Sequence, residues 1–98
     1  MLLTIKNTLR DGILIYDDNF KLIFHSEQNG YLDFINADKY EPYQFSSELA
    51  KKMCLTAKKI VKATGFNCLS EFLNSLEFPI RTNTQTVEVK IDIPNLCL

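Results

Sequence analysis

The chain has 98 residues, 46% of them hydrophobic and 23% charged, and its formal net charge is −1 at pH 7. This length predicts one domain, and the hydrophobic fraction excludes a disordered chain. The near-zero net charge gives no overall attraction to nucleic acid or to anionic membranes. No apolar run approaches the roughly 20 residues of a membrane-spanning helix, and the first residues lack signal-peptide features. We therefore expect a cytoplasmic protein that makes no direct contact with nucleic acid or membrane.

The first predicted element is a short amphipathic helix over residues 2–10. Apolar side chains recur in this segment at i, i+3 and i+7, with one more beside them, as on an apolar helical face. They are Leu2, Leu3, Ile5 and Leu9. A helix this short is marginal on its own in water, so it must pack on something. We therefore expect these four side chains to form a dimer interface, beside the outer sheet face of residues 87–93.

Two strands are predicted next, at residues 12–17 and 20–26, joined by the polar turn Asp17-Asp18-Asn19. In the first run, Ile13 and Ile15 share one face. In the second run, apolar and polar residues again alternate. This period of two is typical of a strand with one buried face.

The middle of the chain is predicted to be helical, with one interruption. Tyr31, Phe34 and Ile35 lie at i, i+3 and i+4, which favours a short helix. Pro42 then disfavours helix in the residue before it, so an extended or turn segment follows.

The clearest helix is predicted over residues 46–64. Ser46 or Ser47 is expected to cap its N-terminus, and Gly65 to stop it. Its lysines are interpreted as a solvated face. Its apolar stripe recurs at helical spacing and comprises Leu49, Ala50, Met53, Cys54, Ala57, Ile60, Val61 and Thr64.

The C-terminal part predicts a second short helix near residues 69–76, with Asn67 as its cap, followed by two strands. The strands cover residues 78–82 and 86–93, and a turn at Asn83-Thr84 joins them. The second of them has the clearest alternation in the chain. A fifth strand would begin at Leu96-Cys97-Leu98.

This order of elements predicts an α+β fold, in which helices pack on one face of an antiparallel sheet. Without a fifth strand, the outer strands would have open edges, which proteins usually cover. We therefore expect the chain to be a fragment of a longer regulator, or its sheet to be completed by a partner.

One segment resembles a known family: Arg10-Asp11-Gly12-Ile13-Leu14-Ile15-Tyr16, with the acidic turn that follows, is similar to the first hairpin of PAS sensor domains. The chain is also similar to the N-terminal PAS-like domain of cyanobacterial LuxR-type transcriptional regulators, in this segment, in the helix of residues 46–64 and in the hairpin of residues 78–93. It departs from them at Phe24-His25-Ser26. The resemblance implies a five-stranded sheet with the last strand in the middle, beside the first. It also implies a sensory or dimerisation module.

The residues that flavin-binding and haem-binding members of that superfamily use are not matched in position by this sequence. Asn67-Cys68 looks like the asparagine–cysteine pair of flavin-binding light sensors, but Cys68 follows the long helix instead of preceding it. Haem-binding PAS domains often use a histidine from the helical side, whereas His25 lies on or after the second strand. The sequence therefore identifies no cofactor, and its cofactor-binding residues stay unassigned.

The three cysteines are Cys54, Cys68 and Cys97, which are widely spaced and include no C-x-x-C pair. We interpret them as small buried hydrophobic residues of a reduced compartment. No cluster of ligands predicts a metal site. No nucleophile, base and orienting acid come together in the sequence, so we expect no enzyme and no catalytic residue.

Two functions follow from these patterns. The first is a sensory or dimerisation module of a cytosolic signalling or transcription regulator, in which ligand or partner binding changes how two protomers pack. Its expected partner is a second copy of the chain, with a small-molecule ligand left open. The second is a ligand-free protein-interaction adaptor, in which large aromatic side chains fill the core.

Overall fold

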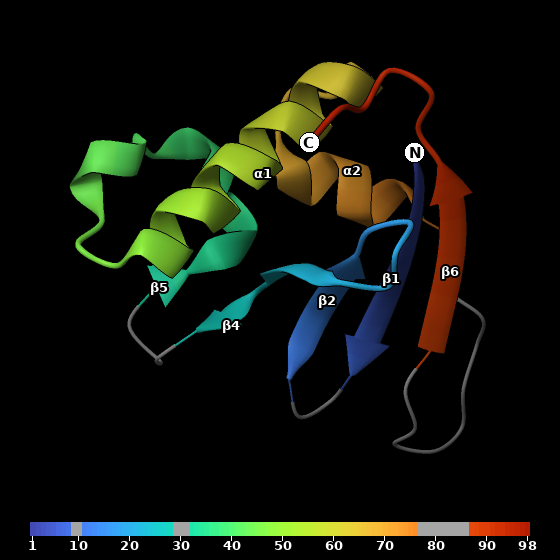
Figure 1. Ribbon diagram of the computed structural model, residues 1–98, viewed down its shortest axis with the longest axis horizontal. Coiled ribbons are helices and arrows are strands. Elements are labelled where there is room, and N and C mark those ends of the chain that lie inside the picture. The colour runs from blue at the N-terminus through green and yellow to red at the C-terminus, as the bar shows by residue number, and fades with distance from the viewer. Residues whose placement is uncertain (9–10, 29–31, 77–86) are drawn as a thin grey trace.

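The computed structural model describes residues 1–8, 11–28, 32–76 and 87–98 (Figure 1). The predicted strand over residues 78–82 and its turn at Asn83-Thr84 lie outside these residues. The strands are β1 (Leu2–Thr8), β2 (Gly12–Tyr16), β3 (Leu22–His25), β4 (Glu27–Gln28), β5 (Leu32–Asp33) and β6 (Val87–Asp92). The helices are α1 (Glu48–Thr64) and α2 (Leu69–Ser75), preceded by two short 3₁₀ segments, Phe34–Lys39 and Pro42–Gln44.

The main sheet is antiparallel, with the order β3-β2-β1-β6 in the described part of the chain. Helices pack on one face of this open sheet, which confirms the predicted α+β class (Figure 1). The first and last described strands are neighbours, as the resemblance implied. However, β1 rather than β6 lies between two other described strands. A separate two-stranded sheet joins β4 and β5.

The predicted helix over residues 2–10 is wrong, because residues 2–8 form strand β1. Both edges of its backbone are hydrogen-bonded, to β2 on one side and to β6 on the other. Leu3 and Ile5 point into the core, where each is 0% exposed. Residues 2–5 are mostly apolar, so they fit a period of 2 as well as one of 3.6. Pairing with distant strands therefore decides the structure.

The strand predicted to begin at residue 96 is not present, because no strand follows β6 in residues 93–98. The Leu96 backbone N–H donates to the Ile93 carbonyl at 3.1 Å, which closes a turn. Leu96 is only 6% exposed and belongs to the hydrophobic core. The short apolar segment at residues 96–98 is therefore a core anchor and an irregular tail, because one buried leucine satisfies it without strand pairing.

Helix α1 begins and ends where local chemistry predicts. Ser47 is its N-cap, with a side-chain oxygen that accepts a hydrogen bond from the Ala50 backbone N–H at 3.3 Å. Gly65 ends it in the left-handed conformation, with φ of 79°, which glycine adopts without strain. Most of the predicted stripe is buried, but Leu49 is 50% exposed and does not face the core.

Helix α2 has the predicted position and a different cap. Cys68 occupies the N-cap position, so the prediction for Asn67 is wrong. Instead, the Asn67 backbone N–H donates to the Glu71 carboxylate at 3.4 Å. The helix buries its apolar face, which consists of Leu69, Phe72 and Leu73.

The β2–β3 connection has a constrained backbone. Asp17 Oδ1 accepts hydrogen bonds from the backbone N–H groups of Asn19 and Lys21, each at 2.9 Å. This is why an acidic residue suits the turn. Phe20 has φ of 62°, an uncommon value for a residue with a side chain. The second strand consequently begins at Leu22 rather than at residue 20.

Candidate interaction surface

Among the described residues, helices cover one face of the main sheet and no helix covers the other. Because successive side chains of a strand alternate between faces, the strand registers assign each residue to one of them. Leu3, Ile5 and Ile15 lie on the covered face and are 0% exposed. The side chains that the registers place on the opposite side form what we call the uncovered sheet face; Thr4, at its middle, is only 3% exposed. With Phe20 from the adjoining turn, this face comprises Leu2, Thr4, Lys6, Leu14, Tyr16, Leu22, His25, Glu88, Lys90 and Asp92.

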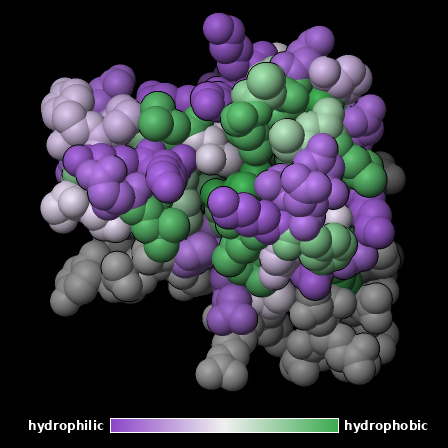
Figure 2. Space-filling model, in the orientation of Figure 1, coloured by the Kyte–Doolittle hydropathy of each residue, from purple (hydrophilic) through white to green (hydrophobic). Residues whose placement is uncertain are grey.

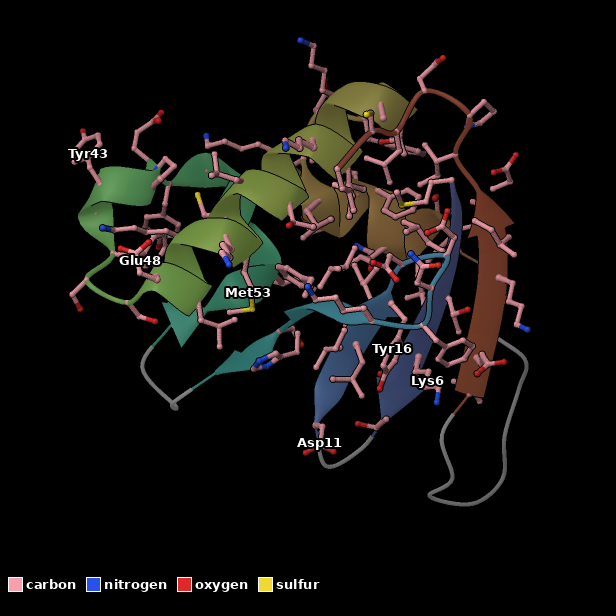
Figure 3. The ribbon with its side chains drawn as sticks, in the orientation of Figure 1. Lys6, Asp11, Tyr16, Tyr43, Glu48 and Met53 are labelled. Carbon is pink, nitrogen blue, oxygen red and sulfur yellow. The ribbon has the colours of Figure 1, made fainter. Side chains whose placement is uncertain are left out.

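An aromatic cluster forms the centre of this face. The rings of Tyr16 and Phe20 lie 5.4 Å apart, and Lys6 Nζ lies 5.1 Å from the Tyr16 ring centroid and 5.8 Å from that of Phe20. Lys6 and Tyr16 lie side by side in Figure 3. Such cation–π contacts are worth about 0.5–1 kcal/mol at exposed sites. The lysine thus holds two aromatic rings together at the surface.

Large apolar side chains on this face are open to solvent. Phe20 is 56% exposed, Leu2 46% and Leu22 42%. The strained backbone at Phe20 places its ring against Tyr16 rather than into the core. Exposed apolar side chains that gather on one face, as Phe20 and Leu22 do beside Tyr16, favour a protein–protein contact surface.

Charges of both signs surround the apolar cluster. Lys6 Nζ lies 3.9 Å from Glu88 Oε1, and these two residues face each other across β1 and β6. Lys90 and Asp92 continue the alternation along the outer side of β6. The N-terminal ammonium lies 3.3 Å from Asp92 Oδ1. A surface with both signs can pair with itself across a twofold axis.

The four residues predicted for a dimer interface lie in different environments. Leu3 and Ile5 are buried within the chain itself, so they are unavailable to a second copy. This part of the prediction fails because a strand, unlike a helix, sends these two residues to the covered face. Leu2 is exposed on the uncovered sheet face, and Leu9 lies outside the described residues. The predicted contribution of the outer side of residues 87–93 stays a prediction.

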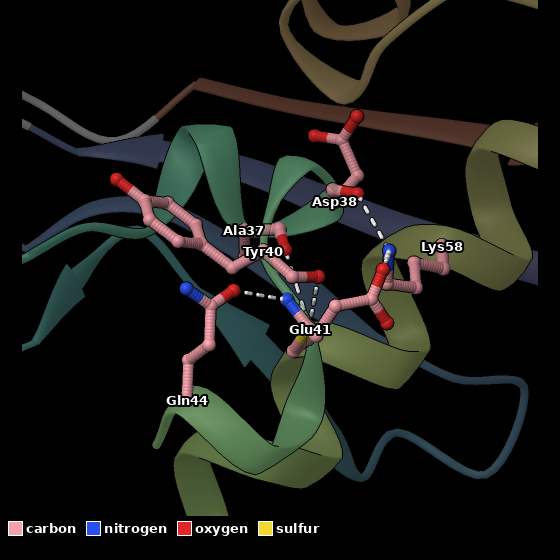
Figure 4. A network of polar contacts seen from close by, with 7 residues as sticks. Ala37, Asp38, Tyr40, Glu41, Gln44 and Lys58 are labelled. Atoms are coloured by element: carbon pink, nitrogen blue, oxygen red, sulfur yellow. Dashed lines mark hydrogen bonds and ion pairs between the residues drawn. The ribbon is translucent and has the colours of Figure 1, made fainter.

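A cluster of polar contacts links α1 to residues 37–41 (Figure 4). Cys54 Sγ lies 3.2 Å from the carbonyl oxygens of both Ala37 and Tyr40, and its thiol can donate to them. Lys58 Nζ donates to the Asp38 carbonyl at 3.0 Å and lies 3.8 Å from Glu41 Oε1. These contacts fasten the segment to the helix.

The chemistry of Cys54 is that of a structural residue. Burial raises the pKa of its thiol above the ordinary 9.0; Lys58 opposes this shift, whereas Glu41 and Asp38 add to it. A raised pKa disfavours the thiolate, which is the nucleophilic form. Of the three cysteines interpreted as buried, Cys54 is buried, Cys68 is partly exposed and Cys97 is exposed. That interpretation therefore holds for Cys54 and is wrong for Cys97.

In the described ranges, no group of three or more histidine, cysteine or acidic side chains lies close enough to hold a metal ion. In the same ranges, no helix is both long and apolar enough to cross a membrane. His25 is partly buried at the end of β3, opposite Leu14.

Sequence reasoning missed the aromatic cluster. Tyr16 and Phe20 were assigned to strands, but the turn between them had to be known before their rings could be placed together. The signal that could have found it is in β2, where Leu14 and Tyr16 on one face alternate with Ile13 and Ile15 on the other, so both faces are apolar. A strand with two apolar faces and only one layer of helices signals an exposed patch.

Comparison with known proteins identifies no relative of this chain. No family model, no curated protein and no solved structure matches the chain. The resemblance to PAS-like domains of LuxR-type regulators therefore stays a prediction.

Proposed function

We propose that the protein is a dimerisation module of a cytosolic regulator, and that it pairs with a second copy through the uncovered sheet face. The observation that carries this proposal is the cluster of the partly exposed Tyr16 with the exposed Phe20 and Leu22, on a sheet whose opposite face packs into the core. Burying such side chains stabilises association by roughly 25 cal/mol for each Å² removed from water.

The mixed charges favour a second copy as the partner. A twofold axis brings the same patch of each protomer together, so each patch must be complementary to itself. The apolar cluster satisfies this on its own. Around it, Lys6 and Lys90 of one protomer can lie opposite Glu88 and Asp92 of the other. The regulatory role is a consequence: a signal that alters either protomer changes how the pair packs.

The test is light scattering on the wild type and on the double variant Phe20→Ser with Leu22→Ser. The wild type should have twice the 11.3 kDa mass of the chain, and the variant the mass of one chain. Tyr43→Ser is the matched control, because Tyr43 is 81% exposed and lies on another element. Both variants should melt as the wild type does at low concentration. A wild-type monomer, or a dimeric double variant, would overturn the proposal.

A ligand-free adaptor is the second candidate function. It is favoured by the filled core, where Phe24, Met53 and Phe72 are each at most 1% exposed between the helices and the sheet. An adaptor would use the same uncovered face for a different protein. Native mass spectrometry of the purified chain separates the two functions, since a dimer supports the first and a monomer without a bound molecule supports the second.

A further inference from the structure

A groove lies between the exposed side of α1, the β2–β3 connection and the C-terminal tail. One cleft of about 370 Å³ separates α1 from the β2–β3 connection and the C-terminal tail, and a second of about 350 Å³ continues between α1 and the tail. Lys59 lines both clefts, so they adjoin. We call the two together the lysine groove. Figure 1 shows the tail returning from β6 to end beside α1.

The lysine groove carries a strong local positive charge. Lys21, Lys52, Lys59 and Lys62 line it, and Asp17 is the only carboxylate among its described lining residues. Asp17 already accepts two backbone hydrogen bonds in its turn. In the described part of the chain, none of the four lysines forms an ion pair. By contrast, Lys51 of the same helix does form an ion pair, with its Nζ 3.2 Å from Glu48 Oε1. The whole chain has a net charge of −1, so this concentration of charge is specific to the groove.

Apolar side chains lie between these lysines. Leu55 of α1 is 44% exposed and Leu98 of the tail is 41% exposed, and both line the larger cleft together with Ile23. Figure 2 shows this side of the molecule, where green apolar side chains lie among purple hydrophilic ones. Leu55 lies in the middle of α1 and is apolar, exposed and flanked by lysines. Such a position suits a partner with both apolar and acidic groups.

The shape of the groove favours a peptide over a small molecule. Sites for small molecules enclose roughly 70–90% of the ligand surface, whereas Lys52, Leu55 and Lys59 are themselves exposed to solvent. From Lys52 to Lys62 the helix rises about 15 Å, at 1.5 Å per residue. An extended peptide of about five residues spans that length.

We propose that the lysine groove binds an acidic peptide segment of a partner protein. Its carboxylates lie opposite Lys52, Lys59 and Lys62, and one apolar side chain packs on Leu55 and Ile23. Nucleic acid is the less favoured anion, because no aromatic side chain for base stacking is among the described lining residues. This inference does not depend on dimerisation, because the lining residues of the groove and the residues of the uncovered sheet face are different sets.

The experiment measures fluorescence anisotropy with a labelled peptide of one leucine flanked by two glutamates on each side. The wild type should bind it saturably, more weakly as salt rises, and should not bind the same peptide with glutamine for glutamate. Lys59→Glu should weaken binding about tenfold or more, since it reverses the charge shared by both clefts. Lys39→Glu is the matched control, because Lys39 is exposed and lines neither cleft. Both variants should keep the wild-type circular dichroism spectrum.

Three results would overturn the inference. The first is no saturable binding of the acidic peptide. The second is an equal loss of binding in Lys59→Glu and Lys39→Glu, which would indicate attraction to overall charge. The third is tighter binding of oligothymidylate or of phosphatidylserine vesicles than of the peptide, which would assign the groove to nucleic acid or membrane. Light scattering of Lys59→Glu should match the wild type, so failure here is distinguishable from failure of the dimer proposal.

Discussion

The two faces of the sheet use similar side chains for different purposes. Phe24 on the covered face is 0% exposed, and Phe20, four residues earlier, is 56% exposed beside Tyr16. The helices stabilise the first through burial, whereas the second lies at the surface against Lys6 and the Tyr16 ring. Hydrophobicity alone therefore does not distinguish a core residue from a binding residue. The register of the strands does.

The largest expected effect separates these two phenylalanines directly. Phe24→Ala removes a fully buried ring and should lower the free energy of unfolding by about 3–5 kcal/mol. Phe20→Ala changes an exposed ring and should cost under about 1 kcal/mol, mainly through its contacts with Tyr16 and Lys6. Urea unfolding followed by circular dichroism, at a concentration where both proteins are monomeric, measures the two values. Equal losses of unfolding free energy would show that Phe20 is buried in the folded chain as Phe24 is.

A smaller effect tests how the covering layer is fastened. Cys54→Ala removes a buried thiol that contacts two carbonyl oxygens, and should cost about 1–2 kcal/mol. The folded protein holds the pKa of this thiol above 9.0, so above pH 9.0 the unfolded chain loses the proton first. Stability from this thiol is thus complete below pH 9.0 and falls as pH rises towards the raised folded pKa.

The measurement for Cys54 is the difference in unfolding free energy between wild type and Cys54→Ala at several pH values. This difference cancels the titration of other groups, and it should shrink above pH 9.0. A difference that stays constant or grows across that range would show that the thiol ionises as easily in the folded protein as in the unfolded one.

The smallest predicted effect concerns the start of α1. Ser47→Ala removes the N-cap acceptor for the Ala50 N–H and should cost about 1 kcal/mol. Ser46→Ala is the matched control, because Ser46 lies next to the cap and outside the helix. Thermal unfolding should show a lower midpoint for the Ser47 variant alone. A matching loss in the Ser46 variant would mean that the cap is misassigned. Neither change should alter the uncovered sheet face.

Local signals in the sequence were enough for most elements. The caps of α1 at Ser47 and Gly65, the strands β2 and β3, and the alternation in β6 all follow from neighbours along the chain. Strand β1 did not, because its short apolar run fits two periodicities and its partners lie far away in sequence. The same error moved Leu3 and Ile5 from the core to a supposed interface. The interface prediction for these two residues thus failed, because it assumed the period of 3.6 of a helix where the chain has the period of 2 of a strand.

The two surfaces differ in how far sequence could reveal them. The sequence indicates that the lysines of α1 lie outside its apolar stripe. The groove itself needs the β2–β3 turn and the tail, which form its other wall. The aromatic cluster needs the left-handed backbone of Phe20. Both surfaces therefore arise from contacts between elements, which no pattern within a single element contains.

Pairing through the uncovered sheet face is tested best by identifying which residues touch across the dimer. Mixing isotope-labelled and unlabelled chains allows nuclear Overhauser effects between protomers to be measured selectively. We expect these effects to involve Tyr16, Phe20 and Leu22 on the uncovered sheet face. Effects confined to α1, or to Tyr43 on its separate 3₁₀ segment, would show that two copies do not pair through this face.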